Sequence, residues 1–254
     1  MAYSTDGSSH HSGIKTEKLL VEYLQSGAAT KAFPDLSDDY KVIKRGGTQF
    51  KQDIEIVNKD EAILISVKKK ENKETGSFDW VNSTKAFTGV APLEKFAKRV
   101  NEISKNEKRY GQAKINRQQA SYDCLNELSS SDLTKILKEN VNDKNKDMYV
   151  MIRDFYSNSL WNFKFCDLPL YDSINNDTPY LQFGNGIESC SILFRKEDGT
   201  ILDHNIRIRV VDNNGISALI GKSKANKSSI ACIKIQQDKV GDLIKSLDNK
   251  IIKF

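Results

Sequence analysis

The sequence of 254 residues contains few cysteines, and none of them stands in a paired arrangement. The four cysteines, at positions 124, 166, 190 and 232, lie much farther apart than the cysteines of zinc sites or redox dithiols do. This spacing excludes both of those classes of site. It is typical of buried thiols in a reducing compartment, and we therefore expect a cytoplasmic protein.

Long apolar runs are also missing. The longest, at residues 62–67, is interrupted by Ser66, whereas a membrane-spanning helix needs about 20 apolar residues. The first residues also lack the hydrophobic core of a secretion signal. The sequence therefore predicts no membrane partner.

Neither sign of charge dominates the chain. Lysine and arginine number 39 against 34 aspartates and glutamates, which gives a formal net charge of +5. A positive field of this size favours a polyanionic partner only where the basic residues are concentrated locally.

The chain shows no internal repeat and one change of composition near its start. Residues 1–12 are rich in serine, glycine and histidine and predict a disordered tail, in which His10 and His11 are better explained as solvated side chains than as metal ligands. We expect residues 13–254 to form a single α/β domain with a central mixed β-sheet flanked by helices. Within it, residues 13–90 form the core elements, 91–145 a helical lobe and 146–254 a strand-rich part.

The first helix of this domain is amphipathic. Ile14, Leu20, Val21 and Leu24 fall on one stripe at 3.6 residues per turn, and Gly27 ends the helix. Glu17 lies within that apolar stripe. Because an unpaired buried carboxylate costs several kcal/mol, we expect Glu17 to face a ligand or a lysine. The alternative is a carboxylate in the first turn that the helix dipole stabilises.

A β-hairpin is the most informative feature of the sequence. Residues 52–57 form one strand, 58–60 the turn and 62–68 the second strand. Since strand side chains alternate between the two faces, Asp53 and Glu55 share one face of the first strand, and Ser66 and Lys68 share one face of the second. We therefore predict that Asp53 and Lys68 face each other.

These residue types suit phosphodiester hydrolysis. A carboxylate holds a divalent metal, and a neighbouring lysine orients or deprotonates the attacking water. Gly46 and Gly47 permit the backbone to approach a phosphate closely. Glu17 supplies a second acid from the preceding helix, and Glu55 is either a third metal ligand or a solvated carboxylate.

The order of these residues carries a resemblance to a known family. A helix glutamate, a strand aspartate and a strand lysine in this order resemble the PD-(D/E)XK nuclease superfamily, and in particular its small type II restriction endonucleases that act on four-base-pair sites. The resemblance is carried by Gly-Ile-Lys-Thr-Glu-Lys at 13–18, Asp53-Ile54, Ile-Ser-Val-Lys at 65–68 and the Gly-, Ser- and Lys-rich segment before residues 233–235. It implies a restriction-endonuclease-like core, Mg²⁺ as cofactor and double-stranded DNA as substrate.

The resemblance also assigns roles to residues. It implies that Asp53 binds metal, Lys68 is catalytic and Glu17 is the helix glutamate. Ser66 departs from the pattern, because the superfamily has glutamate or aspartate there and the four-base-pair cutters have a neutral amide. A serine offers only one short hydroxyl oxygen, which could contact a metal-bound water. The substitution therefore puts in question either the affinity for the metal or the activity itself.

Sequence readout requires residues outside the hairpin. Two turn-prone segments carry donors for phosphates and base edges. The DNA-binding candidates in them are Asn213, Asn214, Lys222, Ser223, Lys224, Asn226 and Lys227. A plain polar hairpin loop is the alternative. For Lys69 and Lys70, which follow the hairpin, solvated charges are favoured over DNA contacts.

The remaining elements follow from periodicity. We expect helices at 92–104, 111–128, 131–139 (with Ser131 as its N-cap) and 240–247, and strands at 41–45, 148–156, 189–194, 201–211, 216–220 and 229–235.

Together these features predict a sequence-specific, Mg²⁺-dependent endonuclease of double-stranded DNA, of the type II restriction class. One alternative is a structure-specific nuclease, such as a junction resolvase or a repair endonuclease. Another is a DNA-binding protein on the same scaffold that has lost activity. The sequence leaves open whether the protein is a monomer or a homodimer.

Overall fold

The computed structural model describes residues 8–45, 52–59, 61–72, 76–82, 89–184, 186–210, 231–247 and 251–253. The chain divides into two compact units, each assembled from separate segments. Unit 1 comprises Met1–Phe78, Lys144–Leu168 and Gln237–Phe254; unit 2 comprises Asp79–Asp143 and Pro169–Gln236. These boundaries cross those of the three parts expected from the sequence within 13–254.

Unit 1 is built on a mixed sheet in the order β1-β2-β3-β6-β7-β12, with β4 paired to β3. The strands are β1 (Lys41–Lys44), β2 (Ile54–Asn58), β3 (Glu61–Lys70), β4 (Gly76–Ser77), β6 (Met148–Asp154), β7 (Ser159–Lys164) and β12 (Ile251–Lys253). β3 and β6 run parallel, and the other neighbours run antiparallel. The expected α/β class with a mixed sheet is therefore confirmed.

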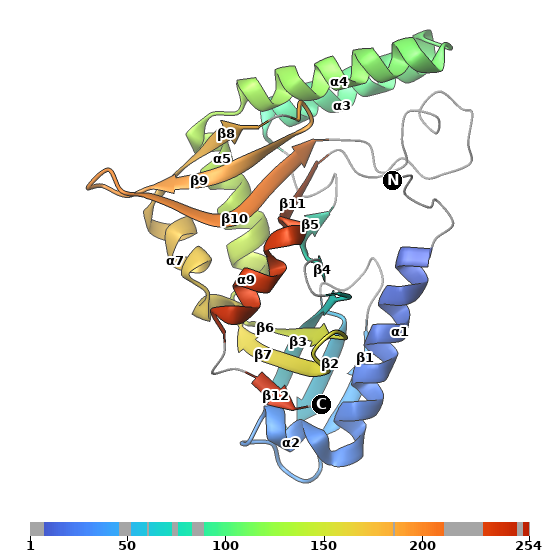
Figure 1. Cartoon of the computed structure of the whole chain (residues 1–254), viewed down its shortest axis with the longest axis vertical. Helices are drawn as coiled ribbons and strands as arrows, with labels where there is room; N and C mark the ends of the chain where they lie inside the picture. The colour runs from blue at the N-terminus through green and yellow to red at the C-terminus, as the bar shows by residue number, and fades with distance from the viewer. Residues whose placement is uncertain are drawn as a thin grey trace. The chain divides into compact units, whose positions relative to one another are not determined.

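Helix α1 (Ser8–Tyr23) packs along one face of this sheet (Figure 1). Leu20 and Leu24 are fully buried against Ile54, Ile56 and Ile65 of the hairpin. The apolar stripe of the helix thus covers the apolar side of β2 and β3, which leaves the alternate positions of both strands on the opposite face. A wide turn, η1 (Leu24–Ala28), ends the helix at Gly27, whose φ of 91° suits glycine, and α2 (Ala29–Ala32) follows.

Unit 2 combines helices with a five-stranded antiparallel sheet in the order β5-β11-β10-β9-β8. Its strands are β5 (Asp79–Asn82), β8 (Thr178–Phe183), β9 (Ser189–Arg195), β10 (Ile201–Val210) and β11 (Ala231–Ile235). Its longer helices are α3 (Ala91–Asn106), α4 (Tyr110–Glu127), α5 (Ser130–Leu137) and α7 (Pro169–Asn176). Ion pairs Lys95–Glu127 and Arg99–Asp123 join α3 to α4, which lie side by side in Figure 1.

The shorter elements complete the two units. They are η3 (Lys138–Asn142), α6 (Asp143–Asn145), η4 (Phe165–Asp167), η5 (Gln237–Lys239) and α9 (Val240–Lys245). Within the part of the chain that the structure describes, no helix is both long and apolar enough to cross a lipid bilayer.

Several boundaries differ from those expected. Helix α1 begins at Ser8, so the predicted disordered tail at 1–12 is wrong over its last residues. The N-cap of α5 is Ser129 rather than Ser131, because the Ser129 side chain accepts the Asp132 N–H while the Asp132 side chain accepts the Ser129 N–H. The predicted strand at 216–220 lies outside the described residues.

Candidate active site

The hairpin of β2 and β3 forms as predicted, with one correction to its register. Ile54 pairs with Ile65, and the backbone N–H of Asp53 donates to the carbonyl of Ile65 at 2.9 Å. Continuing this register by one residue places Ser66 opposite Asp53. Lys68 lies two residues farther along β3. The predicted direct pairing of Asp53 with Lys68 is therefore wrong by two residues of register.

The carboxylate of Asp53 is fixed by β3. Its Oδ2 atom accepts the backbone N–H of Val67 at 2.7 Å and lies 3.5 Å from the hydroxyl of Ser66, which is buried. No hydrogen bond joins Oδ1 to any of the described residues. Asp53 therefore keeps one oxygen for a further ligand while the other anchors it.

Lys68 differs from the two lysines that follow it on β3. It is half-buried, and its Nζ lies 5.8 Å from the centroid of the Phe78 ring. Among the described residues it has no hydrogen bond or ion pair, whereas a carboxylate pairs with each of Lys44, Lys69 and Lys70. A half-buried ammonium without a carboxylate is available to an anionic ligand.

Glu17 faces a lysine, which is one of the two partners expected for it. Its carboxylate lies 3.1 Å from the Nζ of Lys44, and 20% of its side chain is exposed. Because Lys44 pairs with Ile54 across β1 and β2, its side chain lies on the sheet face that α1 covers. This is the opposite face from Asp53.

Glu55 is occupied by an arginine. Its Oε2 accepts a hydrogen bond from the Nε of Arg45 at 2.7 Å. This hydrogen bond lowers the pKa of Glu55, and partial burial opposes it. Glu55 is thus the partner of a guanidinium, an arrangement that the sequence did not predict, and it is not a solvated carboxylate.

The three predicted metal ligands do not meet in the structure. Among the residues that it describes, no group of three or more histidines, cysteines, aspartates or glutamates is arranged to hold a metal ion. Asp53 is close to Ser66, while Glu17 and Glu55 are held by Lys44 and Arg45. The donors present suit a Mg²⁺ that keeps several waters and takes one carboxylate and phosphate oxygens, which is how this ion is commonly bound.

Lys69 and Lys70 are not the solvated charges that the sequence favoured. Lys70 is 5% exposed, and its Nζ lies 3.1 Å from Oδ2 of Asp154 on β6. Lys69 pairs with Glu71 at 2.5 Å, with 13% of its side chain exposed. A DNA contact by Lys70 requires the loss of a buried ion pair, so we do not include Lys70 in the proposal below.

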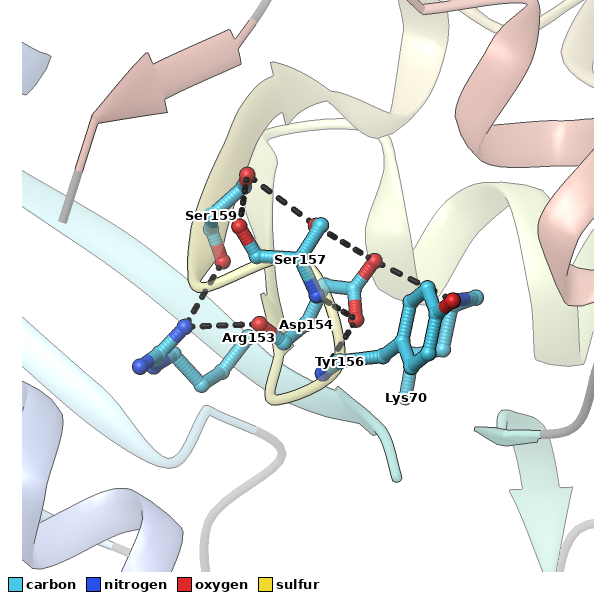
Figure 2. A network of polar contacts seen from close by, with 6 residues as sticks. All are labelled: Lys70, Arg153, Asp154, Tyr156, Ser157 and Ser159. Atoms are coloured by element: carbon cyan, nitrogen blue, oxygen red, sulfur yellow. Dashed lines mark hydrogen bonds and ion pairs between the residues drawn. The ribbon is translucent and has the colours of Figure 1, made fainter. Parts of the chain in front are cut away.

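No pattern in the sequence predicted the network around Asp154 (Figure 2). Besides Lys70, this carboxylate accepts the backbone N–H groups of Tyr156 and Ser157 and the Ser157 hydroxyl, at 2.8, 3.2 and 2.8 Å. Burial alone raises the pKa of Asp154, but the hydrogen bonds from Ser157 and Lys70 outweigh it and the pKa is lowered. Arg153 points the other way, donating to the carbonyls of Asp154 and Ser159 at 2.7 and 3.1 Å.

A second polar cluster lies in unit 2. The Nε2 of His204 on β10 is 2.8 Å from the buried hydroxyl of Ser173 on α7. Burial lowers the pKa of His204, although Asp203 and Asp177 act in the opposite direction. The pair joins the α7 helix to the sheet.

Several predicted site residues cannot be placed. Gly46 and Gly47 lie outside the described residues. So do the predicted DNA-reading residues Asn213, Asn214, Lys222, Ser223, Lys224, Asn226 and Lys227. Their roles stay predictions.

Comparison with known proteins assigns no family. No family model matches the chain, and neither does any curated protein. The functional conclusion therefore depends on the residues themselves.

Proposed function

We propose that the protein is a Mg²⁺-dependent endonuclease of double-stranded DNA that cuts at a specific sequence, with Asp53 and Lys68 at its centre. One observation carries this proposal. Among the described residues, a carboxylate that precedes β2 and keeps one oxygen without a hydrogen bond lies in the same hairpin as a half-buried lysine of β3 that has no carboxylate partner. Glu17, Glu55 and Lys70, by contrast, are each engaged in an ion pair.

The order of the elements supports the same proposal. The chain runs from α1 with Glu17, through the strand that follows Asp53, to the strand that carries Lys68. This is the order on which the resemblance to the PD-(D/E)XK nucleases depends. The mixed sheet, with β6 parallel to β3, is compatible with such an α/β core.

The roles of the residues follow from their chemistry. Asp53 would hold Mg²⁺ through Oδ1, and the bound ion would neutralise charge on the phosphoryl oxygens. Lys68 donates hydrogen bonds to the attacking water or to the scissile phosphate and brings them into position. Ser66 lies where an acid would add a second ligand, and its hydroxyl would contact a metal-bound water instead.

A plasmid digest in the presence of Mg²⁺ tests the proposal. Discrete, reproducible bands are the result expected of the wild-type protein; a smear or cutting only at branches identifies a structure-specific nuclease instead. Asp53→Ala and Lys68→Ala should abolish cleavage and leave binding detectable. Lys18→Ala is the matched control, because this lysine is exposed and its ion pair is with Glu22 on its own helix.

Two outcomes would contradict the proposal. Retained cutting by Asp53→Ala or Lys68→Ala would exclude the site. Binding of DNA by the wild-type protein without hydrolysis in either Mg²⁺ or Mn²⁺ would identify an inactive DNA-binding protein, a role that the serine at position 66 favours.

A further inference from the structure

The five-stranded sheet of unit 2 has one apolar and one polar face along its strand β10. Ile206, Ile208 and Val210 are fully buried, and Arg207 and Arg209 alternate with them. Because strand side chains alternate between the two faces, both arginines lie on the face opposite this apolar core.

The neighbouring strands add further polar groups to the two arginines. β10 lies between β9 and β11 (Figure 1), and Arg207 is opposite Lys234 of β11 on one side and Ser191 of β9 on the other. Arg209 is opposite Ser189 of β9. Directly opposed residues of antiparallel strands have Cβ atoms about 4.5–5.5 Å apart. These three cations and two hydroxyls therefore form one polar surface, which we call the basic face.

The environment of Cys232 shows that the charges of the basic face lie close together. This buried cysteine of β11 is opposite Arg209. Burial raises the pKa of its thiol and Asp79 of β5 adds to this, whereas Lys234, Arg209 and Arg207 lower the pKa. Since a pKa responds to nearby charges, the three cations lie near one thiol.

The cations of the basic face lack sufficient counter-charge. Arg207 and Lys234 are half-buried and have no ion pair among the described residues, and the Nε of Arg207 is buried without a hydrogen bond to any of them. Arg209 shares the carboxylate of Glu188 with Arg117, at 3.7 and 2.5 Å. Like charges opposite each other on a sheet are destabilising, and a partly buried cation without a partner costs free energy. An anionic ligand offsets both costs.

The residue types of the basic face suit a phosphate backbone. Guanidinium groups bind phosphate through parallel hydrogen bonds, and serine hydroxyls are common donors to phosphate oxygens. The cations lie on two strands, and the two arginines are roughly 6.5 Å apart along β10. A ligand with repeated negative charges therefore meets more of these groups at once than a single small anion does.

We propose that the basic face of unit 2 binds the phosphate backbone of DNA. This inference depends on the proposed function for its ligand and adds to it a contact surface outside the hairpin of β2 and β3. Phosphate contacts carry no direct sequence information, so the basic face contributes affinity and orients the duplex rather than selecting the site.

The salt dependence of binding tests this proposal, because each phosphate contact releases counterions. The affinity of the protein for a labelled duplex of arbitrary sequence is measured by fluorescence anisotropy without divalent metal, at a series of salt concentrations. We expect Arg207→Gln, Arg209→Gln and Lys234→Gln each to reduce the steepness of log affinity against log salt by about 0.9. This corresponds to about eightfold weaker binding at about 0.1 M salt when the affinities are equal at about 1 M. Arg207→Lys should keep the wild-type slope, because the charge is kept.

Lys196→Gln is the matched control. This exposed lysine follows β9 in the same unit, and its charge acts on the neighbouring carboxylate of Asp198. The substitution removes the same charge from the chain and should leave the slope unchanged. Circular dichroism and the thermal midpoint establish that each variant folds.

Three results would overturn the role of the basic face. The first is an unchanged slope in the folded triple variant Arg207→Gln/Arg209→Gln/Lys234→Gln. The second is an equal loss in Lys196→Gln, which would show that net charge alone is the cause. The third is tighter binding of polyglutamate than of the duplex, lost in the same triple variant, which would assign the face to an acidic protein.

Cleavage of a plasmid separates this inference from the function on which it depends. A wild-type protein that binds DNA with the expected losses in the variants but cuts none supports the basic face and contradicts the nuclease function. A wild-type protein that cuts, with an unchanged slope in the triple variant, overturns the basic face alone. A wild-type protein that neither binds nor cuts DNA contradicts both.

Discussion

Lys70 and Asp154 form an ion pair of 3.1 Å between side chains that are only 6% and 3% exposed. They lie 84 positions apart in the sequence and join the parallel strands β3 and β6. The attraction between the two buried charges offsets the free energy lost when each is removed from water. If one charge is deleted, the desolvation of the other is no longer compensated.

Removal of Lys70 should therefore be severe. We expect Lys70→Met to lower the free energy of unfolding by about 3–5 kcal/mol, since it leaves the Asp154 carboxylate buried without its cation. Urea denaturation measures the change. Lys69→Met, which breaks an ion pair to the exposed Glu71, should cost about 1 kcal/mol or less; an equal loss in both variants would contradict this view of the pair.

The same carboxylate should make the fold sensitive to acid. The pKa of Asp154 is lowered in the folded chain, so the stabilisation is complete above the ordinary aspartate pKa of about 3.9 and is lost as the pH falls through the lowered value. Unfolding free energies of the wild type should thus drop below about pH 4 more steeply than those of Asp154→Asn. Parallel profiles for the two proteins would refute the assignment.

His204 predicts a second pH effect in a different range. Burial lowers its pKa in the folded chain, so the unfolded chain takes up a proton as the pH falls through about 6.5 while the folded chain resists it. Stability should be complete above that pH and decline toward pH 5. His204→Gln should remove the decline. Thermal melts between about pH 8 and about pH 5 measure this difference.

The serine at position 66 gives a prediction about the metal. Ser66→Asp should tighten Mg²⁺ binding by about fivefold or more, because one charge at about 4 Å is worth about 1 kcal/mol even in water. The Mg²⁺ concentration for half-maximal cleavage reports this change. Ser66→Asn is the control of similar size without the charge, and an equal shift in both variants would show that charge is not the cause.

Local patterns predicted a large part of the fold. The hairpin was correct because Ile54, Ile56 and Ile65 alternate with polar residues, and this period of two is a property of neighbours in sequence. α3 and α4 were correct to within two residues because their periodicity is equally local.

The missed elements share a physical reason. In β7, the residues from Leu160 to Phe163 are all buried, so no alternation marks it as a strand. α7 and β8 were missed as well, and α7 is only eight residues long.

The candidate site was predictable only in part. The alternation of the hairpin placed Asp53, Ser66 and Lys68 on one face, but the register that puts Ser66 rather than Lys68 opposite Asp53 required coordinates. The partners of Glu17 and Glu55 depend on β1, which positions Lys44 and Arg45 beside them. A long side chain can reach several partners on neighbouring strands, and spacing in the sequence does not determine which of them it contacts.

The assembly of unit 1 from three chain segments bears on how the protein is made by the ribosome. β3 ends at Lys70 and its parallel neighbour β6 begins at Met148, so synthesis at about 5–20 residues per second separates them by roughly 4–16 s. β12, which pairs with β7, is translated later still. During that interval the edge of β3 in the nascent hairpin is unpaired. An unpaired edge promotes chaperone binding or aggregation until the later strands are synthesised.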